Sequence, residues 1–210
     1  MNLLRSVLDI FYPRFCYVCQ IPSYGLLCQR CKGKVEKLHS FKTLFLFDSH
    51  IEKVFSLYEY RDEISTLLQI FKYECRWEVA EYLLSLVSIH LGNYDFIVPV
   101  PLHHVRFRER GGNQSEIVAK HISKISGIPM VKKGIIRTRY TKKQVELSRD
   151  ERLQNVKGAF RVLNPERFRG KRVLLVDDVY TTGATLENLA KAFKGFPDLI
   201  DGFVLASSKI

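Results

Sequence analysis

The chain has 210 residues, which is enough for one ordinary domain and a small appendage. Its residues are 46% hydrophobic and 26% charged, as in globular proteins, and the lack of any run of about 18 uncharged apolar residues argues against a membrane-spanning helix. The net charge of +11 predicts an anionic partner, and the excess is regional, because residues 103–172 hold 19 Lys and Arg against 6 Asp and Glu, a net of +13.

Four of the five cysteines form two Cys-x-x-Cys pairs that are separated by eight residues. Each pair supplies two thiolates from one tight turn, and Zn²⁺ prefers four such ligands in a tetrahedron. A redox-active Cys-x-x-Cys is the alternative, but two pairs this close together favour a structural metal site. The N-terminal segment fits a secretory signal poorly, so we expect a cytoplasmic protein with reduced thiols. The sequence therefore predicts a zinc-binding module in residues 1–39, with the ligands Cys16, Cys19, Cys28 and Cys31.

Strands and helices are predicted to alternate through residues 40–210. Hydrophobic periodicity predicts strands at 54–60, 96–100, 173–176 and 203–205, and helices at 62–73, 78–91, 114–126 and 186–193. Strands that alternate with helices are typical of βαβ units around a mostly parallel sheet. We therefore predict that residues 40–210 form an α/β domain, with a parallel sheet flanked by helices.

An arginine-rich stretch follows the predicted strand at 96–100. Arg106, Arg108 and Arg110 lie within five residues, after a proline-bounded segment and before a Gly-Gly turn. A loop that follows a parallel strand lies at the carboxyl edge of the sheet, where arginines can bind a phosphate in bidentate fashion. His103 offers general acid–base chemistry in the same loop, but we interpret it as a polar loop residue because the sequence identifies no partner for it.

Aromatic residues are interspersed with basic ones between residues 103 and 172: Phe107, Tyr140, Phe160 and Phe168. Such a mixture is typical of a groove that binds a phosphate backbone and stacks bases. The alternative is that these aromatic residues belong to the core, which we expect above all for Phe160. The candidate contacts with nucleic acid are Arg108, Lys142 and Lys143.

The strongest chemical signal is VLLVDDVYTTGAT, residues 173–185. An apolar strand at 173–176 places Asp177 and Asp178 at its carboxyl end, where open α/β sheets bind ligands. The following residues offer hydroxyl groups, a glycine for a tight turn and the N–H groups of a helix start, namely Thr181, Thr182, Gly183, Ala184 and Thr185. Two adjacent carboxylates beside an anion site need hydroxyl groups or a cation opposite them, which a ribose diol and Mg²⁺ would provide. The alternative is an acidic turn with a Thr cap and no ligand, and the length of the string argues against it.

This string resembles the motif with which type I phosphoribosyltransferases bind 5-phosphoribosyl 1-pyrophosphate (PRPP). The resemblance implies a type I phosphoribosyltransferase-like fold in which Asp177 and Asp178 contact the ribose hydroxyls and residues 181–185 hold the 5′-phosphate. In that fold the loop after the first core strand holds the pyrophosphate, here with Arg106 and Arg110 as reinforcement. The residues in that loop are Pro99, Val100, Pro101, Leu102 and His103.

Along essentially its whole length the chain resembles the competence protein F (ComF) family. Besides the PRPP motif, three blocks carry the resemblance: FYPRFCYVC…CQRC, IVPVPLHHVRFRERGGNQS and RTRYTKKQVELSRDERLQNVKGAF. The second block departs from the family at Gly112, where an aromatic residue is typical. The third block lies where type I enzymes carry a mobile active-site loop, so the resemblance implies that Arg139, Thr141 and Gln144 are candidate catalytic residues.

The ComF resemblance implies a role in natural transformation, in which the protein binds PRPP-Mg²⁺ and handles incoming single-stranded DNA. The implied partners are other DNA-uptake proteins at the inner face of the membrane, with this protein cytoplasmic or peripheral to that face. Two alternatives stay open: an active phosphoribosyltransferase that acts on a nucleobase or amine, and a PRPP-sensing regulator without catalysis. The sequence identifies no acceptor and no residue that would activate one.

Overall fold

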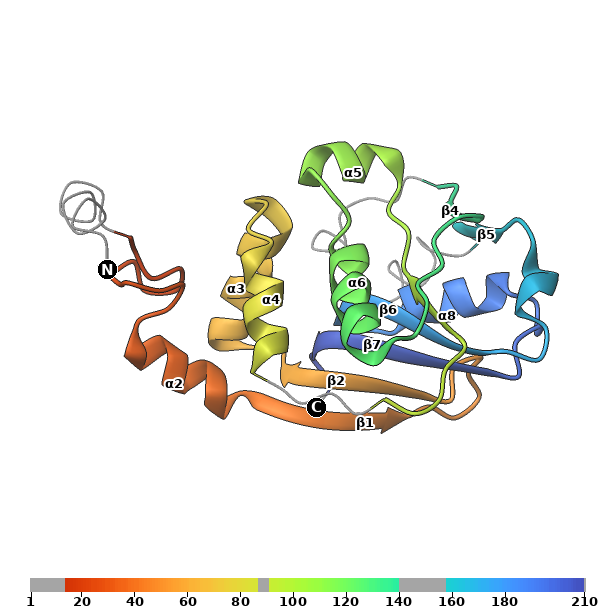
Figure 1. Cartoon of the computed structure of the whole chain (residues 1–210), viewed down its shortest axis with the longest axis horizontal. Helices are drawn as coiled ribbons and strands as arrows, with labels where there is room; N and C mark the ends of the chain where they lie inside the picture. The colour runs from red at the N-terminus through yellow and green to blue at the C-terminus, as the bar shows by residue number, and fades with distance from the viewer. Residues whose placement is uncertain (1–13, 87–90, 140–157, 210) are drawn as a thin grey trace.

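The computed structural model describes residues 14–86, 91–139 and 158–209, which form two β-sheets and their covering helices. The strands are β1 (His39–Phe45), β2 (Lys53–Glu59), β3 (Phe96–Pro99), β4 (Ile135–Arg137), β5 (Phe160–Val162), β6 (Arg172–Tyr180) and β7 (Leu199–Ser207). The large sheet has the order β1-β2-β7-β6-β3 (Figure 1). Its last four strands run parallel, β1 is antiparallel to β2, and β4 pairs with β5 in a separate antiparallel sheet.

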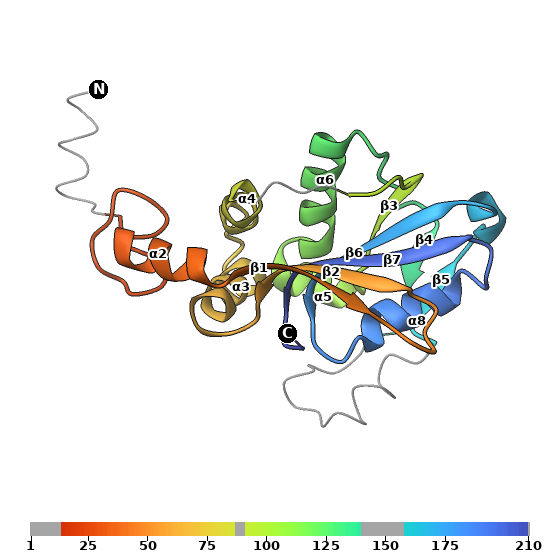
Figure 2. The same ribbon diagram turned by 90° about the horizontal axis from the view of Figure 1, so that it is seen from below.

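The helices cover both faces of the large sheet. They are α2 (Gln29–Lys37), α3 (Asp62–Tyr73), α4 (Glu78–Ser85), α5 (His104–Arg110), α6 (Gln114–Ser126), the 3₁₀ helix η2 (Pro165–Phe168) and α8 (Ala184–Ala192). Figure 2 shows α6 and α8 on opposite faces. Alternate residues of the central strand β6 face opposite sides of the sheet. Leu174 and Val176 pack with α3, α4 and α6, whereas Val173 and Leu175 pack with α8. None of the helices described is long and apolar enough to cross a membrane.

The cysteine-containing segment and α2 lie at one end of the molecule, beside α3 and α4 (Figures 1 and 2). Cys31 and Val35 of α2 are buried in the same hydrophobic cluster as α3 and α4. The Tyr17 hydroxyl donates a hydrogen bond of 2.6 Å to Glu78 at the start of α4. The segment is therefore packed on the α/β part through both apolar and polar contacts.

The predicted fold class is confirmed, and α3 and α6 have the predicted bounds. The central strand is longer than its apolar run, because β6 continues to pair with β7 as far as Tyr180. Asp177 and Asp178 therefore lie within the strand and not after it. The predicted helix at 78–91 begins as expected at Glu78, but it ends earlier than predicted, at Ser85 with Leu86 as its C-cap. Residues 87–90 lie outside the described part of the chain.

The prediction that residues 104–110 form a loop is wrong, because they form helix α5. His103 caps this helix by accepting a hydrogen bond from the Val105 N–H at 3.4 Å, and Gly111 ends it with a φ of 64°. Polar caps define the helix without an apolar stripe, so hydrophobic periodicity does not detect it. As a result Arg106 and Arg110 project from one helix, four residues apart.

Candidate functional site

A pocket of about 320 Å³ opens at the carboxyl edge of the parallel strands, between β6, α3, α5 and the start of α8. It gathers most of the residues that the sequence singled out: Val100, Leu102, Arg106, Arg110, Asp177, Asp178, Thr181, Thr182, Gly183, Ala184 and Thr185. Other predicted residues do not line it: Pro99, Pro101, His103, Arg108 and Arg139. His103 instead serves as the cap of α5.

The two adjacent carboxylates, Asp177 and Asp178, are part of the pocket lining. Asp177 accepts a hydrogen bond of 2.8 Å from the Ser115 hydroxyl and one of 2.9 Å from the backbone N–H of Asp178. Burial, followed by the negative charge of Asp178, raises the pKa of Asp177 to about 6. Asp178 forms an ion pair of 3.2 Å with Lys72, which comes from α3. The acidic pair is therefore partly neutralised by protein groups and still faces the open pocket.

Positive charge exceeds negative charge in the pocket lining. Four cationic side chains, Lys72, Arg106, Arg110 and Arg137, stand against Asp177 and Asp178. The Nε atom of Arg110 is buried and has no hydrogen-bond partner among the described residues, so one buried donor is available to a ligand. This lining suits a ligand that carries more than one negative charge and also offers hydroxyl groups to the carboxylates.

The turn that begins α8 forms another part of the pocket lining. Gly183 caps the helix with a φ of 83°, and the Thr182 hydroxyl accepts a hydrogen bond of 3.3 Å from the Ala184 N–H. The first N–H groups of a helix lack intrahelical partners and bind anions, with support from the helix dipole. A side chain at position 183 would not fit, because its Cβ would lie 2.5 Å from the Tyr180 hydroxyl oxygen.

Replacing Gly183 with Ala is expected to destabilise the protein. The left-handed conformation costs an alanine about 1–2 kcal/mol before the contact with Tyr180 is counted, and each kcal/mol lowers the melting temperature of a chain this size by about 2–4 °C. Thermal unfolding followed by circular dichroism checks this. Gly33→Ala is the control, because a Cβ there meets nothing within 4 Å and its melting temperature should not fall. Equal melting temperatures for Gly183→Ala and the wild type would contradict the described turn.

Several pocket residues were not found by sequence reasoning, among them Lys72, Tyr73 and Ser115. Lys72 and Tyr73 lie in the predicted helix at 62–73, but nothing in the pattern connects that helix with position 178. Ser115 lies two residues after Asn113, at the start of α6. Asn113 caps this helix and donates a hydrogen bond of 2.9 Å to the Val100 carbonyl. The Asn-Gln-Ser start of α6 was visible in the sequence, and a polar helix start behind a ligand loop is the signal that could have identified Ser115.

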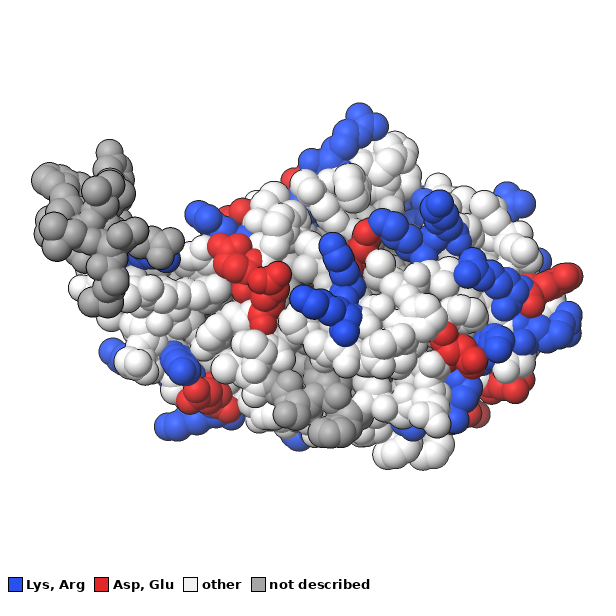
Figure 3. Space-filling model, viewed as in Figure 1, with Lys and Arg blue, Asp and Glu red and all other residues white. Residues whose placement is uncertain are grey.

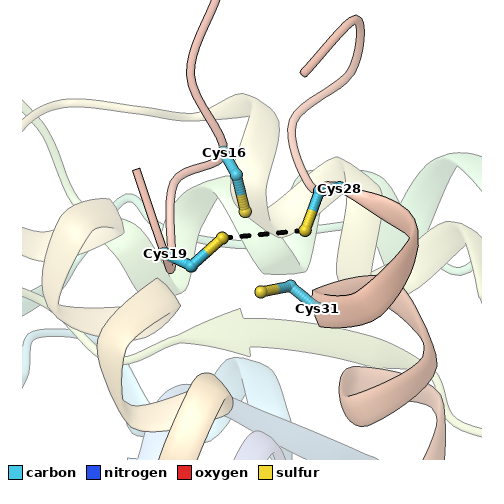
Figure 4. Close-up of side chains that lie close together, drawn as sticks. All are labelled: Cys16, Cys19, Cys28 and Cys31. Atoms are coloured by element: carbon cyan, nitrogen blue, oxygen red, sulfur yellow. Dashed lines mark hydrogen bonds between the residues drawn. The ribbon is translucent and has the colours of Figure 1, made fainter. Parts of the chain in front are cut away.

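The four N-terminal cysteines form the second candidate site. Figure 4 shows their side chains pointing toward one another, and all four sulfur atoms lie within 4.8 Å of one another. The Cys19 and Cys28 sulfur atoms are 3.6 Å apart. A tetrahedral Zn²⁺ with Zn–S bonds of about 2.3 Å places its sulfur ligands about 3.8 Å apart. Cys28 and Cys31 come from the N-terminal turn of α2, and Cys16 and Cys19 come from the tight turn before it.

The thiols of this cluster are electrostatically unequal. Burial alone would raise the pKa of Cys16, but backbone N–H groups, including those of Cys19 and Cys28, stabilise the thiolate and lower its pKa to about 6. Burial, followed by contacts with the other thiols, raises the pKa of Cys31. Several thiolates this close together repel one another unless a cation lies between them. The cluster can therefore hold a metal ion, and four thiols at this spacing fit zinc.

The structure describes only part of the predicted nucleic-acid surface. Arg108 is exposed on α5, and Phe107 beside it is 49% exposed. Phe160 belongs to the core, as expected, and so does Phe168, so the prediction of a stacking role for Phe168 is wrong. Figure 3 shows Lys and Arg side chains over α5 and around the β4–β5 end of the molecule. The remaining candidates lie outside the described residues: Tyr140, Thr141, Lys142, Lys143 and Gln144.

A family comparison points to the same part of the chain as the pocket. The model of the phosphoribosyl transferase domain matches residues 81–196, which is more than half of the chain. The match includes β3, α5, α6, β6 and the start of α8, and therefore most of the pocket lining. It does not include α3, from which Lys72 and Tyr73 come.

Curated proteins that this chain resembles have related names. Competence protein F of Haemophilus influenzae is 31% identical over 153 residues, which span 68% of this chain and 67% of the relative. DNA utilization protein YhgH of Escherichia coli K12 is 28% identical over 206 residues, with 85% of this chain and 90% of the relative covered. Competence protein ComFC of Bacillus subtilis is 26% identical over 93% of this chain and 85% of the relative.

Two solved structures show weak similarity to this chain. Glutamine PRPP amidotransferase of B. subtilis is 20% identical with a TM-score of 0.39, and the similar region covers 63% of this chain but only 26% of that one. Adenine phosphoribosyltransferase of Leishmania donovani is 14% identical with a TM-score of 0.34, over 84% of this chain and 79% of the enzyme.

Proposed function

Since this chain belongs to the ComF family of phosphoribosyl transferase domain proteins, we propose that it acts in competence and DNA utilisation by binding PRPP-Mg²⁺ and single-stranded DNA. The observation that carries the proposal is the composition of the pocket. A ligand must offer hydroxyl groups to two carboxylates, and phosphates to a helix start and several cations. PRPP has a ribose diol, a 5′-phosphate and a pyrophosphate in one small molecule, and it meets each of these demands.

Different pocket residues would contact different parts of PRPP. Asp177 and Asp178 would accept hydrogen bonds from the ribose hydroxyls, and residues 181–185 would hold the 5′-phosphate. Arg106 and Arg110, with the backbone near Val100 and Leu102, would hold the pyrophosphate. When bound, Mg²⁺ neutralises part of the negative charge of the pyrophosphate. The two carboxylates provide oxygen ligands of the kind that Mg²⁺ prefers.

A second candidate function is catalysis, and the family match to a phosphoribosyl transferase domain favours it. The protein would then transfer the phosphoribosyl group to a nucleobase or amine, with Arg139, Thr141 and Gln144 as candidate loop residues. Pyrophosphate release measured with a panel of bases separates this candidate from a binding protein or sensor. We also propose that residues 1–39 are a zinc module attached to a domain of residues 40–210, and that the protein works at the cytoplasmic face of the membrane with other DNA-uptake proteins.

Binding of single-stranded DNA is expected to weaken steeply with salt. Each phosphate contact contributes about −0.7 to the slope of log affinity against log salt concentration, and exposed aromatic side chains such as Phe107 would add about 1–3 kcal/mol per stacked base. Reversing the charges of Lys142 and Lys143 should therefore weaken binding to all sequences and make the slope shallower by about 1.4 if both contact phosphate. Fluorescence anisotropy of a labelled oligonucleotide, with and without PRPP-Mg²⁺, measures both quantities.

The matched control reverses Lys120 and Lys124, two exposed residues of α6, and makes the same change in net charge. It should leave the slope closer to that of the wild type. Equal slopes for the wild type and the Lys142/Lys143 variant would place the DNA surface elsewhere. No binding at about 50 mM salt, which favours electrostatic association, would contradict DNA binding itself.

A further inference from the structure

Lys72 occupies a position that neither the sequence pattern nor the family match identifies. It lies in the last turn of α3, before the matched region begins at residue 81. Its Nζ atom is 3.2 Å from Asp178, and the two side chains are only 18% and 10% exposed. The ion pair lines the ligand pocket, directly beside Asp177.

The end of α3 is held in place by α5 and α6. Gln114 donates a hydrogen bond of 3.4 Å to the Phe71 carbonyl, and the Cys75 thiol donates one of 3.1 Å to the Arg110 carbonyl. The Arg110 guanidinium lies over the Tyr73 ring at 5.6 Å. These contacts flank Lys72 on both sides along the chain. The carboxyl end of a helix also favours a cation through the helix dipole, so α3 is well suited to hold an ammonium group there.

Stability alone gives a weak reason for this ion pair. The cost of removing two charges from water largely offsets their attraction, so buried pairs contribute little to net stability. The pair has a more direct consequence in the pocket. The ammonium group stands against the carboxylate oxygen that would otherwise be open to a divalent cation.

We propose that Lys72 is the resident counter-ion of Asp177 and Asp178, which keeps a free divalent cation out of the acidic pair until an anionic ligand enters the pocket. The inference deepens the function proposed above, and its ligand step rests on that function. When a pyrophosphate group enters, the flexible lysine side chain can share its charge between Asp178 and the phosphate oxygens. The site would then take up divalent cation together with the phosphorylated ligand and not before it.

The test uses Mn²⁺ alone as the probe and needs no PRPP. The electron paramagnetic resonance signal of free Mn²⁺ is titrated with zinc-loaded full-length protein. Wild-type protein is expected to leave most of the signal unchanged, whereas Lys72→Met should bind Mn²⁺ at least about tenfold more tightly, because the repelling charge beside the carboxylates is gone. Adding Asp178→Asn to Lys72→Met should remove the gained affinity. Lys72→Arg, which keeps the charge, should behave as the wild type.

Lys171→Met is the matched control. Lys171 also forms a 3.2 Å ion pair with an aspartate, Asp95, but beside the amino end of β6, far from the pocket. Its loss should not create a Mn²⁺ site. If Lys72→Met does not fold, Lys72→Gln removes the same charge and gives the same test.

Two results would overturn the proposal. One is Mn²⁺ binding by the wild type and the charge-removing variant with affinities that agree within about twofold. The other is the absence of Mn²⁺ binding by both proteins. Failure of PRPP to bind would contradict the proposed function and leave these titrations unaffected, so the two results are distinguishable.

Discussion

Asp177→Asn combined with Asp178→Asn is expected to abolish the stabilisation that PRPP-Mg²⁺ gives to the wild type. A ligand at 100 times its Kd stabilises the folded state by about 2.7 kcal/mol. That corresponds to a rise in melting temperature of about 5–11 °C for a chain of this size. The double variant replaces two charged acceptors of the ribose hydroxyls with neutral amides, which accept weaker hydrogen bonds and carry an NH₂ group that cannot accept one. It also removes the negative charge that requires hydroxyls or a cation opposite it. Differential scanning fluorimetry at millimolar PRPP-Mg²⁺ measures the shift.

In the absence of ligand, the Asp177/Asp178 double variant should still fold, because Asn has nearly the same shape as Asp. Burial and the charge of Asp178 raise the pKa of Asp177 to about 6 in the folded protein, compared with about 3.9 in an unfolded chain. Ionisation of Asp177 therefore costs stability as the pH rises from about 4 through 6, and Asn removes that cost. Loss of the partner of Lys72 acts in the opposite direction. We expect a melting temperature within a few degrees of the wild type.

The control for this experiment is Asp95→Asn with Asp198→Asn, at the amino end of β6 and outside the pocket. This variant makes the same change in charge and should keep the full shift with PRPP-Mg²⁺. A double Asp177/Asp178 variant that is stabilised as much as the wild type would show that the acidic pair does not contact the ligand.

Removal of the metal is expected to unfold the cysteine module. Zinc binding to small modules is worth about 10–16 kcal/mol and is coupled to their folding. Cys28→Ser takes away one of the four thiolates, so zinc content should fall from one ion per chain to nearly none. The segment before β1 should become sensitive to proteases. The melting temperature of the remaining chain should also fall, because Cys31 and Val35 share a hydrophobic cluster with α3 and α4.

Cys75→Ser is the control for the metal experiment, because Cys75 is exposed and does not belong to the cysteine cluster. It should retain zinc. Elemental analysis and limited proteolysis measure the two effects. Wild-type protein that contains no zinc when prepared without chelators, and has disulfides between these cysteines, would contradict a metal site.

Local patterns predicted the parts of the fold that depend on local physics. The apolar spacing of Ile64, Leu67, Leu68 and Phe71 gave α3 its bounds, because those residues form one buried stripe. The Thr-Thr-Gly turn was predicted before α8 for a similar reason, since Gly183 is the residue that tolerates the left-handed cap. In both cases neighbours in the chain determine the conformation.

Features that depend on distant contacts were predicted poorly. β6 extends through two aspartates because β7 pairs with it, and pairing of this kind has no signature in β6 itself. Phe168 looked like a stacking residue beside basic neighbours, but it packs edge-to-face with Phe96 and Phe193 in the core. Lys72 reaches the site because the end of α3 contacts α5 and the start of α6, which are distant from it in the sequence. The candidate site was thus predicted on the β6–α8 side and missed on the α3 side.

The most direct measurement is a calorimetric titration of the wild-type protein with PRPP in the presence of Mg²⁺. We expect a single site per chain with a Kd tighter than about 1 mM, which corresponds to a binding free energy of at least about −4.1 kcal/mol. Ribose 5-phosphate, which lacks the pyrophosphate that Arg106 and Arg110 would hold, should bind more weakly at the same site. The predicted result is saturable binding of PRPP by the wild type and no such binding by the Asp177/Asp178 variant. No binding of PRPP at several millimolar, by protein that contains its zinc and melts cooperatively, would contradict the account.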